Sequence, residues 1–443
     1  MSAELAGLVL DLVAKAAPDA EAEVTVLRGE LALTRFAGSA IHQNVAEDTG
    51  KVRLRLHTEG RTASSSTTLT SMDALEALVE RTIGAARLRP EDTGWGGLTP
   101  PSPLSGEGNY DPATAAADPG ARAAVVRAFV DAAGGLETAG YCRTTETIAV
   151  YANSAGQSVT GRATAAITDG IARTCSSDGV ARSAAVRLGD LDGAALGGHA
   201  AARARLAADP VPLAPGRYPV VLEPSAVADL LSFSAWYGFN GRAVAEGRSF
   251  VELGHEQFDP AITLHDDPLR PDALGVPFDA EGAPKRPLPL VLGGISTSLT
   301  HDRRTARQAG AESTGHAVPG GERFGALAGH LCLRPGPEGP DLLAGLDRGL
   351  LVSDLWYTRV LDPRTLVVTG LTRNGVWWVE DGQIVRPVRN LRFTQSYLDA
   401  LAPGSVQAVG ARAESIPGTY GEGRTSTPGV RLASWNFTGG AAD

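Results

Sequence analysis

Residues 294–317 read GISTSLTHDRRTARQAGAESTGHA, and this stretch carries the most informative pattern in the chain. Gly294 closes a glycine pair that is typical of a turn at the end of a strand. Thr300 or Asp302 can then cap a helix, because a polar oxygen at that position accepts an unpaired backbone N–H of the first helical turn. The stretch therefore predicts a strand, a polar connection and a short helix.

Ser296, His301 and Asp302 of the same stretch are the residue types of a serine hydrolase triad. A triad needs its three side chains to converge in space with the acid behind the base, which closeness along the chain does not provide. The chain also lacks the G-x-S-x-G elbow of many hydrolases. We therefore interpret these residues as part of a helix-capping connection.

Nucleotide and metal motifs are absent from the sequence. It contains neither G-x-G-x-x-G after a strand nor a Walker A sequence. None of the eight histidines lies in H-E-x-x-H or H-E-x-x-x-H, where a helix would place two imidazoles on one face. A set formed by His255, Glu256, His265 and Asp266 is the alternative that would give this chain a metal site of its own.

The composition is that of a globular protein, with 43% hydrophobic and 20% charged residues in a chain of 443. The net charge is −10 and no basic stripe offsets it, so we expect no general binding to nucleic acid or to a membrane surface. Three cysteines without a C-x-x-C pair indicate a reducing compartment rather than a disulfide scaffold. Because the first residues do not resemble a signal peptide, we predict a cytoplasmic protein.

The order of the expected elements indicates an α+β protein of two domains. Apolar periodicity predicts helices near 5–13, 70–88, 120–134 and 194–208, and strands at 24–27, 31–36, 52–57 and through 138–190, separated by turns that contain glycine. Prolines and a glycine in 209–217 predict a linker. It would join an N-terminal α+β domain, residues 1–208, to a β-rich C-terminal domain, residues 218–443.

Several blocks of the second half resemble the TldD/PmbA (TldE) family. Gly294–Leu299, followed by Glu312–Ala317, resembles the loop, the helix and the Ser-Thr-Gly-Asn-Ala signature of that family. Further similar blocks are Val244–Phe250, Leu264–Pro268, Gly349–Val352 and Val379–Ile384. The order and spacing of these blocks over residues 218–410 carry the resemblance, whereas residues 1–200 agree only in the order of their elements.

The resemblance implies a cytoplasmic dimer that encloses a chamber. One branch, TldD, is a zinc metalloprotease with H-E-x-x-x-H on the first helix of its C-terminal domain and a cysteine in a Gly-Thr-Cys-Gly stretch. The other branch, PmbA/TldE, lacks the metal motif and pairs with TldD. In this chain the corresponding helix reads DLLSFSAWY over 229–237, and residues 418–421 read Gly-Thr-Tyr-Gly, with Tyr420 in the cysteine place.

This departure implies a PmbA/TldE-like, non-catalytic subunit, because zinc proteolysis needs three protein ligands, an open water position and a base. We expect no cofactor in this chain, with zinc held by a TldD-like partner. Other expected partners are a second copy of this chain and an unstructured peptide, but neither nucleic acid nor a membrane. A peptidase with its own metal site and a homodimeric peptide-binding scaffold are the alternatives.

We expect residues within 294–317 to contact the bound peptide or the wall of the chamber. Arginine offers a forked set of donors for peptide carbonyls or a terminal carboxylate, and hydroxyls and imidazole add further polar contacts. The candidate residues are Arg303, Arg304, Ser313, Thr314 and His316.

Overall fold

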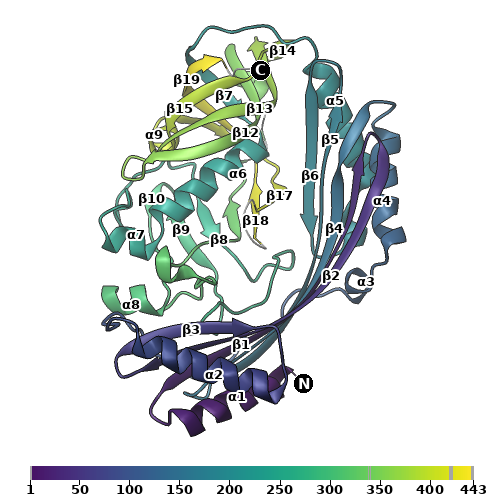
Figure 1. Cartoon of the computed structure of the whole chain (residues 1–443). Coiled ribbons are helices and arrows are strands. Elements are labelled where there is room, and N and C mark those ends of the chain that lie inside the picture. The colour runs from purple at the N-terminus through teal and green to yellow at the C-terminus, as the bar shows by residue number, and fades with distance from the viewer. Residues whose placement is uncertain (1, 338, 340, 419–422, 441–443) are drawn as a thin grey trace.

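The computed structural model describes residues 2–337, 339, 341–418 and 423–440. Its N-terminal half is built on an antiparallel sheet in the order β3-β2-β1-β4-β5-β6, whose long strands run up the side of the molecule (Figure 1). The strands are β1 (Glu21–Ala37), β2 (Ala40–Thr58), β3 (Arg61–Thr67), β4 (Glu137–Asn153), β5 (Ser158–Arg173) and β6 (Asp178–Ala185). The antiparallel strands predicted through 138–190 are confirmed.

The first strand is longer than the sequence predicts. We expected a glycine-containing turn between 24–27 and 31–36, but Gly29 lies inside β1 and pairs with Thr49 of β2 and Thr147 of β4. A Cβ atom at Gly29 would come within 3.3 Å of the carbonyl oxygen of Glu146. Glycine here permits a close approach of strands, which is its other common use in a sheet.

Helices cover one face of this sheet. α1 (Ser2–Ala16) and α2 (Met72–Arg87) pack on one end, and α4 (Pro119–Ala132) and α5 (Gly193–Leu206) pack on the other end, near the short α3 (Pro112–Ala115). Val24 and Val26 of β1 point into the core beneath α1 and α2. Since side chains alternate along a strand, the odd-numbered residues of β1 face the C-terminal half instead.

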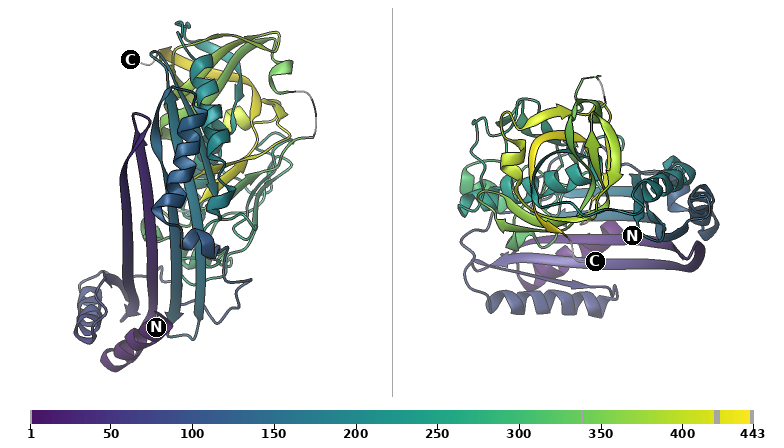
Figure 2. Two further views of the ribbon diagram at one scale, coloured as in Figure 1. Left: turned by 90° about the vertical axis from the view of Figure 1, so that its right-hand side faces the viewer. Right: turned by 90° about the horizontal axis from the view of Figure 1, so that it is seen from above.

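A small barrel forms the far end of the C-terminal half. Its strands follow the order β12-β7-β19-β15-β13-β14, and the additional pairing of β12 with β13 closes the ring, which is visible from above (Figure 2). Trp435, Phe393 and Tyr397 fill part of its core. The strands are β7 (Gly216–Leu222), β12 (Arg348–Asp362), β13 (Val367–Glu380), β14 (Gln383–Pro387), β15 (Leu391–Ser396), β16 (Val406–Val409), which pairs with β19, and β19 (Val430–Gly440).

A second C-terminal sheet, in the order β10-β9-β8-β11-β18-β17, lies below the barrel in Figure 1. Its strands are β8 (Leu264–Asp266), β9 (Leu288–Leu292), β10 (Ile295–Ser296), β11 (Leu331–Leu333), β17 (Glu414–Pro417) and β18 (Arg424–Thr427). The helices of the C-terminal half are α6 (Pro224–Phe233), which continues into a π-helical turn (Ser234–Gly238), α7 (Gly241–Ala245), α8 (Arg303–Ala309) and α9 (Tyr397–Leu401), which packs against the barrel. Short 3₁₀ turns are Leu188–Asp190, Gly321–Arg323 and Leu343–Gly345.

Residues 294–317 fold as their capping pattern predicts. Asp302 is the N-cap of α8, and its Oδ1 accepts the backbone N–H of Thr305 at 2.7 Å. Gly310 ends the helix in the left-handed conformation, with φ of 64°, which glycine adopts at little cost. Thr300, the other capping candidate, instead donates its hydroxyl to backbone carbonyls outside the helix.

The α+β class is confirmed, and the division into domains at 208 and 218 stays a prediction. The segment 209–217 is held to the barrel, because the backbone of Val211 bonds with Pro387 and Arg389, and β7 already begins at Gly216.

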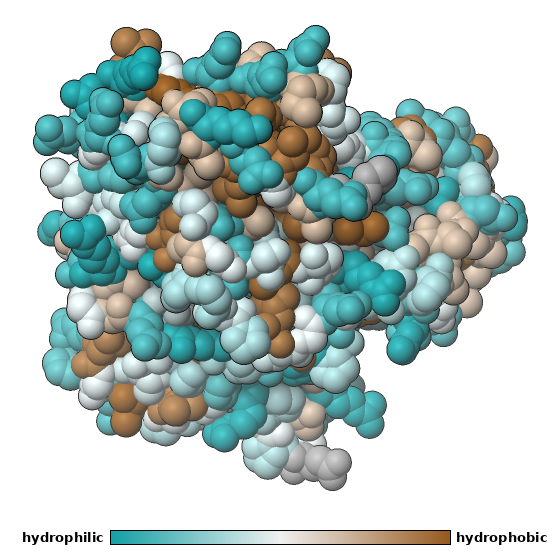
Figure 3. Space-filling model, turned by 90° about the horizontal axis from the view of Figure 1, so that it is seen from below, coloured by the Kyte–Doolittle hydropathy of each residue, from teal (hydrophilic) through white to brown (hydrophobic). Residues whose placement is uncertain are grey.

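Among the described helices, none is long and apolar enough to cross a membrane. Seen from below, apolar residues gather in a band within a mixed surface (Figure 3).

Candidate functional site

A cavity of about 1350 Å³ lies between the N-terminal sheet and the C-terminal half. Ordinary small-molecule pockets hold roughly 300–1,000 Å³, so this space suits a larger ligand. Odd-numbered residues of β1, β2 and β4 form one wall, and the end of α6 with its π-helical turn forms another. Residues between 274 and 280, 315 and 319, and 327 and 331 add to the lining, together with parts of α7, β12 and β18 and of neighbouring loops. The cavity therefore exists only when both halves of the chain are in place.

Aromatic side chains make the helical wall of the cavity. Leu230 and Leu231 of α6 are buried in the core, which leaves Phe233, Trp236 and Tyr237 on the cavity side. The rings of Phe233 and Tyr237 stack with their centroids 5.9 Å apart and their planes 7° from parallel. The π-helical turn closes i→i+5 rather than i→i+4, and Phe233 and Tyr237, which are four residues apart, still lie on one face of it. The result is an apolar surface of aromatic rings on the cavity side.

Asp229 of α6 lies behind this wall. Its carboxylate accepts hydrogen bonds from Oγ1 of Thr358 at 2.9 Å and from the hydroxyl of Tyr397 at 3.0 Å. Burial raises the pKa of Asp229 to about 7, even though both hydrogen bonds act to lower it. The folded protein therefore holds a proton here at pH values where the unfolded chain has lost it.

We expect Asp229→Asn to change how stability depends on pH. Between about pH 4 and the folded pKa of about 7, the folded wild-type protein binds more protons at Asp229 than the unfolded chain does, so this group's stabilisation is lost as pH rises. The asparagine amide resembles the protonated carboxyl and does not titrate. The variant should therefore gain stability relative to wild type with increasing pH, by at most about 1.4 kcal/mol per pH unit. Urea unfolding at several pH values would measure this gain.

Asp11→Asn, on the exposed side of α1, is the matched control and should show no such trend. A difference between wild type and Asp229→Asn that stays constant from acid to neutral pH would contradict the raised pKa.

A buried contact between an aspartate and a histidine supports the polar wall of the cavity. Oδ2 of Asp266 lies 2.9 Å from Nε2 of His316, and Oδ1 accepts the backbone N–H of His330 at 2.6 Å. Burial would raise the pKa of Asp266, but the hydrogen bond and charge of His316 and the contacts of His330 outweigh it, so the pKa is lowered. Nδ1 of His316 is 2.9 Å from the carbonyl oxygen of Thr314. These contacts fix two lining loops to β8.

The five residues that the sequence singles out lie in one region, and His316 is the one of them that lines the cavity. Arg303 donates to the carbonyl oxygens of Gly96 and Gly97, and Arg304 pairs with Asp92 at 2.7 Å.

Ser313 and Thr314 bond with the backbone of His301 behind the loop. Contact of the five residues with a ligand stays a prediction. All five make contacts within the chain, and Arg303 and Arg304 join α8 to the N-terminal half.

The alternative metal set is not brought together. Nδ1 of His255 lies 2.8 Å from Glu252 on the surface, and Asp266 is occupied by His316. His265 neighbours Asp266 on β8, so their side chains point to opposite faces. Within the described ranges, no group of three or more His, Cys, Asp and Glu side chains is placed to hold a metal ion. Tyr420 lies outside the described residues.

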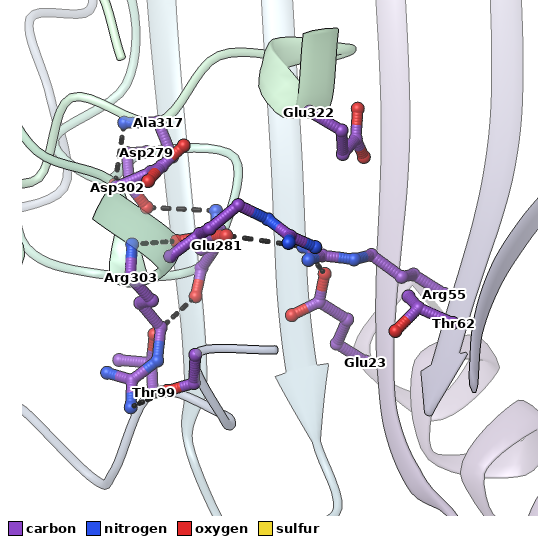
Figure 4. A network of polar contacts seen from close by, with 12 residues as sticks. Glu23, Arg55, Thr62, Thr99, Asp279, Glu281, Asp302, Arg303, Ala317 and Glu322 are labelled. Atoms are coloured by element: carbon purple, nitrogen blue, oxygen red, sulfur yellow. Dashed lines mark hydrogen bonds and ion pairs between the residues drawn. The ribbon is translucent and has the colours of Figure 1, made fainter. Parts of the chain in front are cut away.

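A buried polar network joins the two halves beside the cavity (Figure 4). The guanidinium of Arg55 on β2 lies 3.0 Å from Glu23 of β1 and 3.2 Å from Glu281. The other carboxylate oxygen of Glu281 accepts the backbone N–H of Arg303 at 2.9 Å. Tyr151 of β4 donates its hydroxyl to Glu23 at 2.9 Å. One cation thus faces two buried carboxylates that come from different halves of the chain.

Burial and the nearby charge of Asp279 raise the pKa of Glu281 to about 7, although Arg55 acts to lower it. The guanidinium of Arg55 also lies over the ring of Trp95, with 4.7 Å from Cζ to the ring centroid. Sequence reasoning missed this network and the cavity residues of β2. The alternation of Lys51, Arg53 and Arg55 along one strand was the signal that could have shown them on a common face.

The fold and the C-terminal half have counterparts among known proteins. Residues 215–439 match the PmbA/TldA metallopeptidase C-terminal domain. The chain belongs to the PmbA/TldD family. The structure is similar to that of TldE from Thermococcus kodakarensis, with a TM-score of 0.87, 19% identity and coverage of 98% of this chain and 99% of that one. At this identity the likeness shows the fold alone.

Two curated relatives match over shorter stretches. The metalloprotease PmbA of Escherichia coli O157:H7 is 29% identical over 150 residues, which are 33% of this chain and 31% of that protein. An uncharacterized protein of Methanocaldococcus jannaschii is 33% identical over 104 residues, 23% of this chain and 25% of that protein. The matched regions thus span between a quarter and a third of the curated relatives.

The metal that a PmbA/TldD metallopeptidase implies does not fit the described residues of this chain. The segment to which the resemblance assigns H-E-x-x-x-H presents Ser232, Phe233 and Tyr237 to the cavity. Its one carboxyl, that of Asp229, is bound by Thr358 and Tyr397 behind the wall. Aromatic rings are not zinc ligands, and a serine hydroxyl is not among the usual imidazole, thiolate and carboxylate donors.

Proposed function

We propose that this chain is a non-catalytic, peptide-binding subunit of a cytoplasmic PmbA/TldD-family zinc metallopeptidase, in which a second, TldD-like chain holds the zinc. The observation that carries the proposal is the aromatic wall formed by Phe233, Trp236 and Tyr237 where the metal-binding helix of a protease would lie. A cavity of about 1350 Å³ supports a ligand the size of a peptide segment. The three cysteines are free, which agrees with a reducing compartment.

In this proposal the chain binds and orients the peptide. Phe233 and Tyr237 provide apolar contact area at a small cost in conformational entropy, because aromatic side chains have few rotatable bonds. The loop that carries His316 and the backbone of Gly315 and Gly329 provide polar contacts. Cleavage would take place in the partner, where a bound zinc would supply an activated water and a Lewis acid for the peptide carbonyl.

Native mass spectrometry of the tagged chain, purified from its own host, tests the proposal. The expected result is a complex of this chain with one different chain and zinc, and zinc-dependent cleavage of an unstructured peptide by that complex. The separated chain should bind the peptide and leave it intact when zinc is added. A homodimer with stoichiometric zinc and its own peptidase activity would overturn the proposal, and a metal-free homodimer would favour a peptide-binding scaffold.

A further inference from the structure

We propose that the peptide taken by this cavity is acidic, an extended segment rich in aspartate and glutamate that is held by cations of the cavity wall. That the ligand is a peptide rests on the proposed function. That it is acidic rests on the charges that line the cavity, which are opposite to those of the protein as a whole.

The lining is cationic in an acidic protein. The chain has 50 acidic and 40 basic residues, whereas the charged lining residues are mostly basic. The basic ones are Lys51, Arg53, Arg248, Lys285, Arg323 and Arg359, and the acidic ones are Asp266 and Asp279. The chain contains only three lysines, and two of them are here. Such an inversion of sign in a partly enclosed site concentrates ligands of the opposite charge.

Both aspartates of the lining are already engaged by the protein. Asp266 is paired with His316. Asp279 is buried and accepts the backbone N–H groups of Glu281, Ala283 and Ala317, each at 2.9 Å. Neither carboxylate is therefore available to neutralise the cations that face the cavity.

Three of the cations are open to a ligand. Arg53 pairs with Glu322 and Arg248 with Glu246, so part of their charge is compensated. The side chains of Lys51, Arg323 and Arg359 are exposed, and no carboxylate of the described residues lies within ion-pair distance of them.

These three cations belong to different elements. Lys51 is on β2, Arg323 ends the 3₁₀ turn Gly321–Arg323, and Arg359 is on β12 of the barrel, with its guanidinium over the ring of Tyr357. In Figure 1, β2 runs along the N-terminal sheet, whereas β12 belongs to the barrel at the top. A ligand that spans the cavity would therefore meet positive charge from both halves of the chain, which favours an extended polyanion over a single small anion.

The aromatic wall favours a peptide over a single-stranded nucleic acid. Proteins that bind single strands use open ring faces on which bases stack. Here Phe233 and Tyr237 stack on each other, so the facing sides of both rings are already covered. A nucleic acid that continued beyond the cavity would also meet a surface with the chain's net charge of −10, whereas a short acidic peptide stays within the cationic lining.

Fluorescence anisotropy with three labelled peptides tests the inference. The peptides have equal length and blocked ends and differ only in carrying Glu, Gln or Lys at alternate positions. The full chain is used as it purifies, with a chelator present so that any zinc peptidase that accompanies it is inactive. We expect the Glu peptide to bind about tenfold more tightly than the Gln peptide, since each exposed ion pair between a glutamate and a cation of the wall strengthens binding only modestly. High salt should remove this preference, because it screens exposed charges.

The variant Lys51→Gln/Arg323→Gln/Arg359→Gln should abolish the preference and keep the affinity for the Gln peptide. The matched control, Lys15→Gln/Arg89→Gln/Arg127→Gln, removes one lysine and two arginines that are exposed outside the cavity, and it should keep the preference. Each variant changes exposed side chains, so both should fold.

Two results overturn the inference and leave the proposed function standing. One is equal binding of the Glu and Gln peptides, and the other is an unchanged preference in the cavity variant. A single-stranded oligonucleotide of equal charge that displaces the Glu peptide more effectively than unlabelled Glu peptide does would overturn it in favour of nucleic acid. Failure of all three peptides to bind would instead overturn the proposed function together with the inference.

Discussion

Arg55→Leu is expected to lower the free energy of unfolding by about 3–5 kcal/mol, because it leaves buried carboxylates without their cation. Glu23 and Glu281 lie 3.0 and 3.2 Å from the guanidinium and come from the two halves of the chain. The substitution also removes the guanidinium from the face of Trp95. Chemical denaturation followed by circular dichroism would measure the loss, and we expect the junction between the halves to unfold first.

Arg28→Leu is the matched control, since Arg28 is exposed on the adjacent strand and its loss should change stability by less than about 0.5 kcal/mol. Adding Glu23→Gln and Glu281→Gln to Arg55→Leu should recover most of the loss, because no unpaired charge then remains buried. A loss below about 1 kcal/mol for Arg55→Leu alone would show that the network does not hold the halves together.

The cost of Arg55→Leu should also depend on pH. The pKa of Glu281 is raised to about 7, so lowering the pH protonates this carboxyl before most others. A protonated carboxyl needs no cation, and the loss should therefore be smaller near about pH 5 than near about pH 8. The opposite trend would contradict the raised pKa.

Asp266→Ala is expected to be destabilising by a similar amount, about 3–5 kcal/mol, and to weaken peptide binding. The substitution leaves the imidazole of His316 and the backbone N–H of His330 buried without their acceptor. Because both residues belong to loops that line the cavity, the wall should loosen as well. Denaturation and peptide anisotropy on the same samples would measure the two effects.

Asp267→Ala is the control for this prediction, because Asp267 is the next residue, is less buried and accepts a local backbone hydrogen bond from Leu269. Asp266→Asn should retain more stability than the alanine variant, since an amide oxygen can still accept the N–H of His330. Equal stability of Asp266→Ala and Asp267→Ala would contradict a structural role for the contact between Asp266 and His316.

The stabilisation from Asp266 should disappear in acid. Its pKa is lowered in the folded protein, so its contribution is complete above the unfolded pKa of about 4 and is lost as pH falls through the folded value. The stability difference between wild type and Asp266→Asn should therefore narrow at low pH. This trend is opposite to the one expected for Asp229, whose pKa is raised.

Much of the fold can be predicted from sequence because its signals are local. The spacing of apolar residues predicted α1, α2 and α4, an alanine-rich run predicted α5, and a polar residue at 300 or 302 predicted the start of α8. The predicted turn at Gly29 was wrong, because glycine occurs both in turns and at close contacts between strands, and only the neighbouring strands distinguish the two.

The candidate site could be predicted only in part. His316 lines the cavity, whereas Arg303 and Arg304 contact the segment 92–97 of the N-terminal half, and contact of any of them with a ligand stays a prediction. A sequence pattern shows that an arginine can bind a carbonyl or a carboxylate. It does not show whether that group belongs to a ligand or to the same chain.

The sequence alone was enough for the α+β class, for the similarity of residues 218–410 to the PmbA/TldD family and for the missing H-E-x-x-x-H, because these depend on residues close together in the chain. Tertiary structure decided the rest. Lys51, Phe233 and His316 meet around one cavity, and Glu23, Arg55 and Glu281 share one buried network, only because the two halves pack against each other. Burial then sets the charge of these groups, and burial is a property of the folded chain.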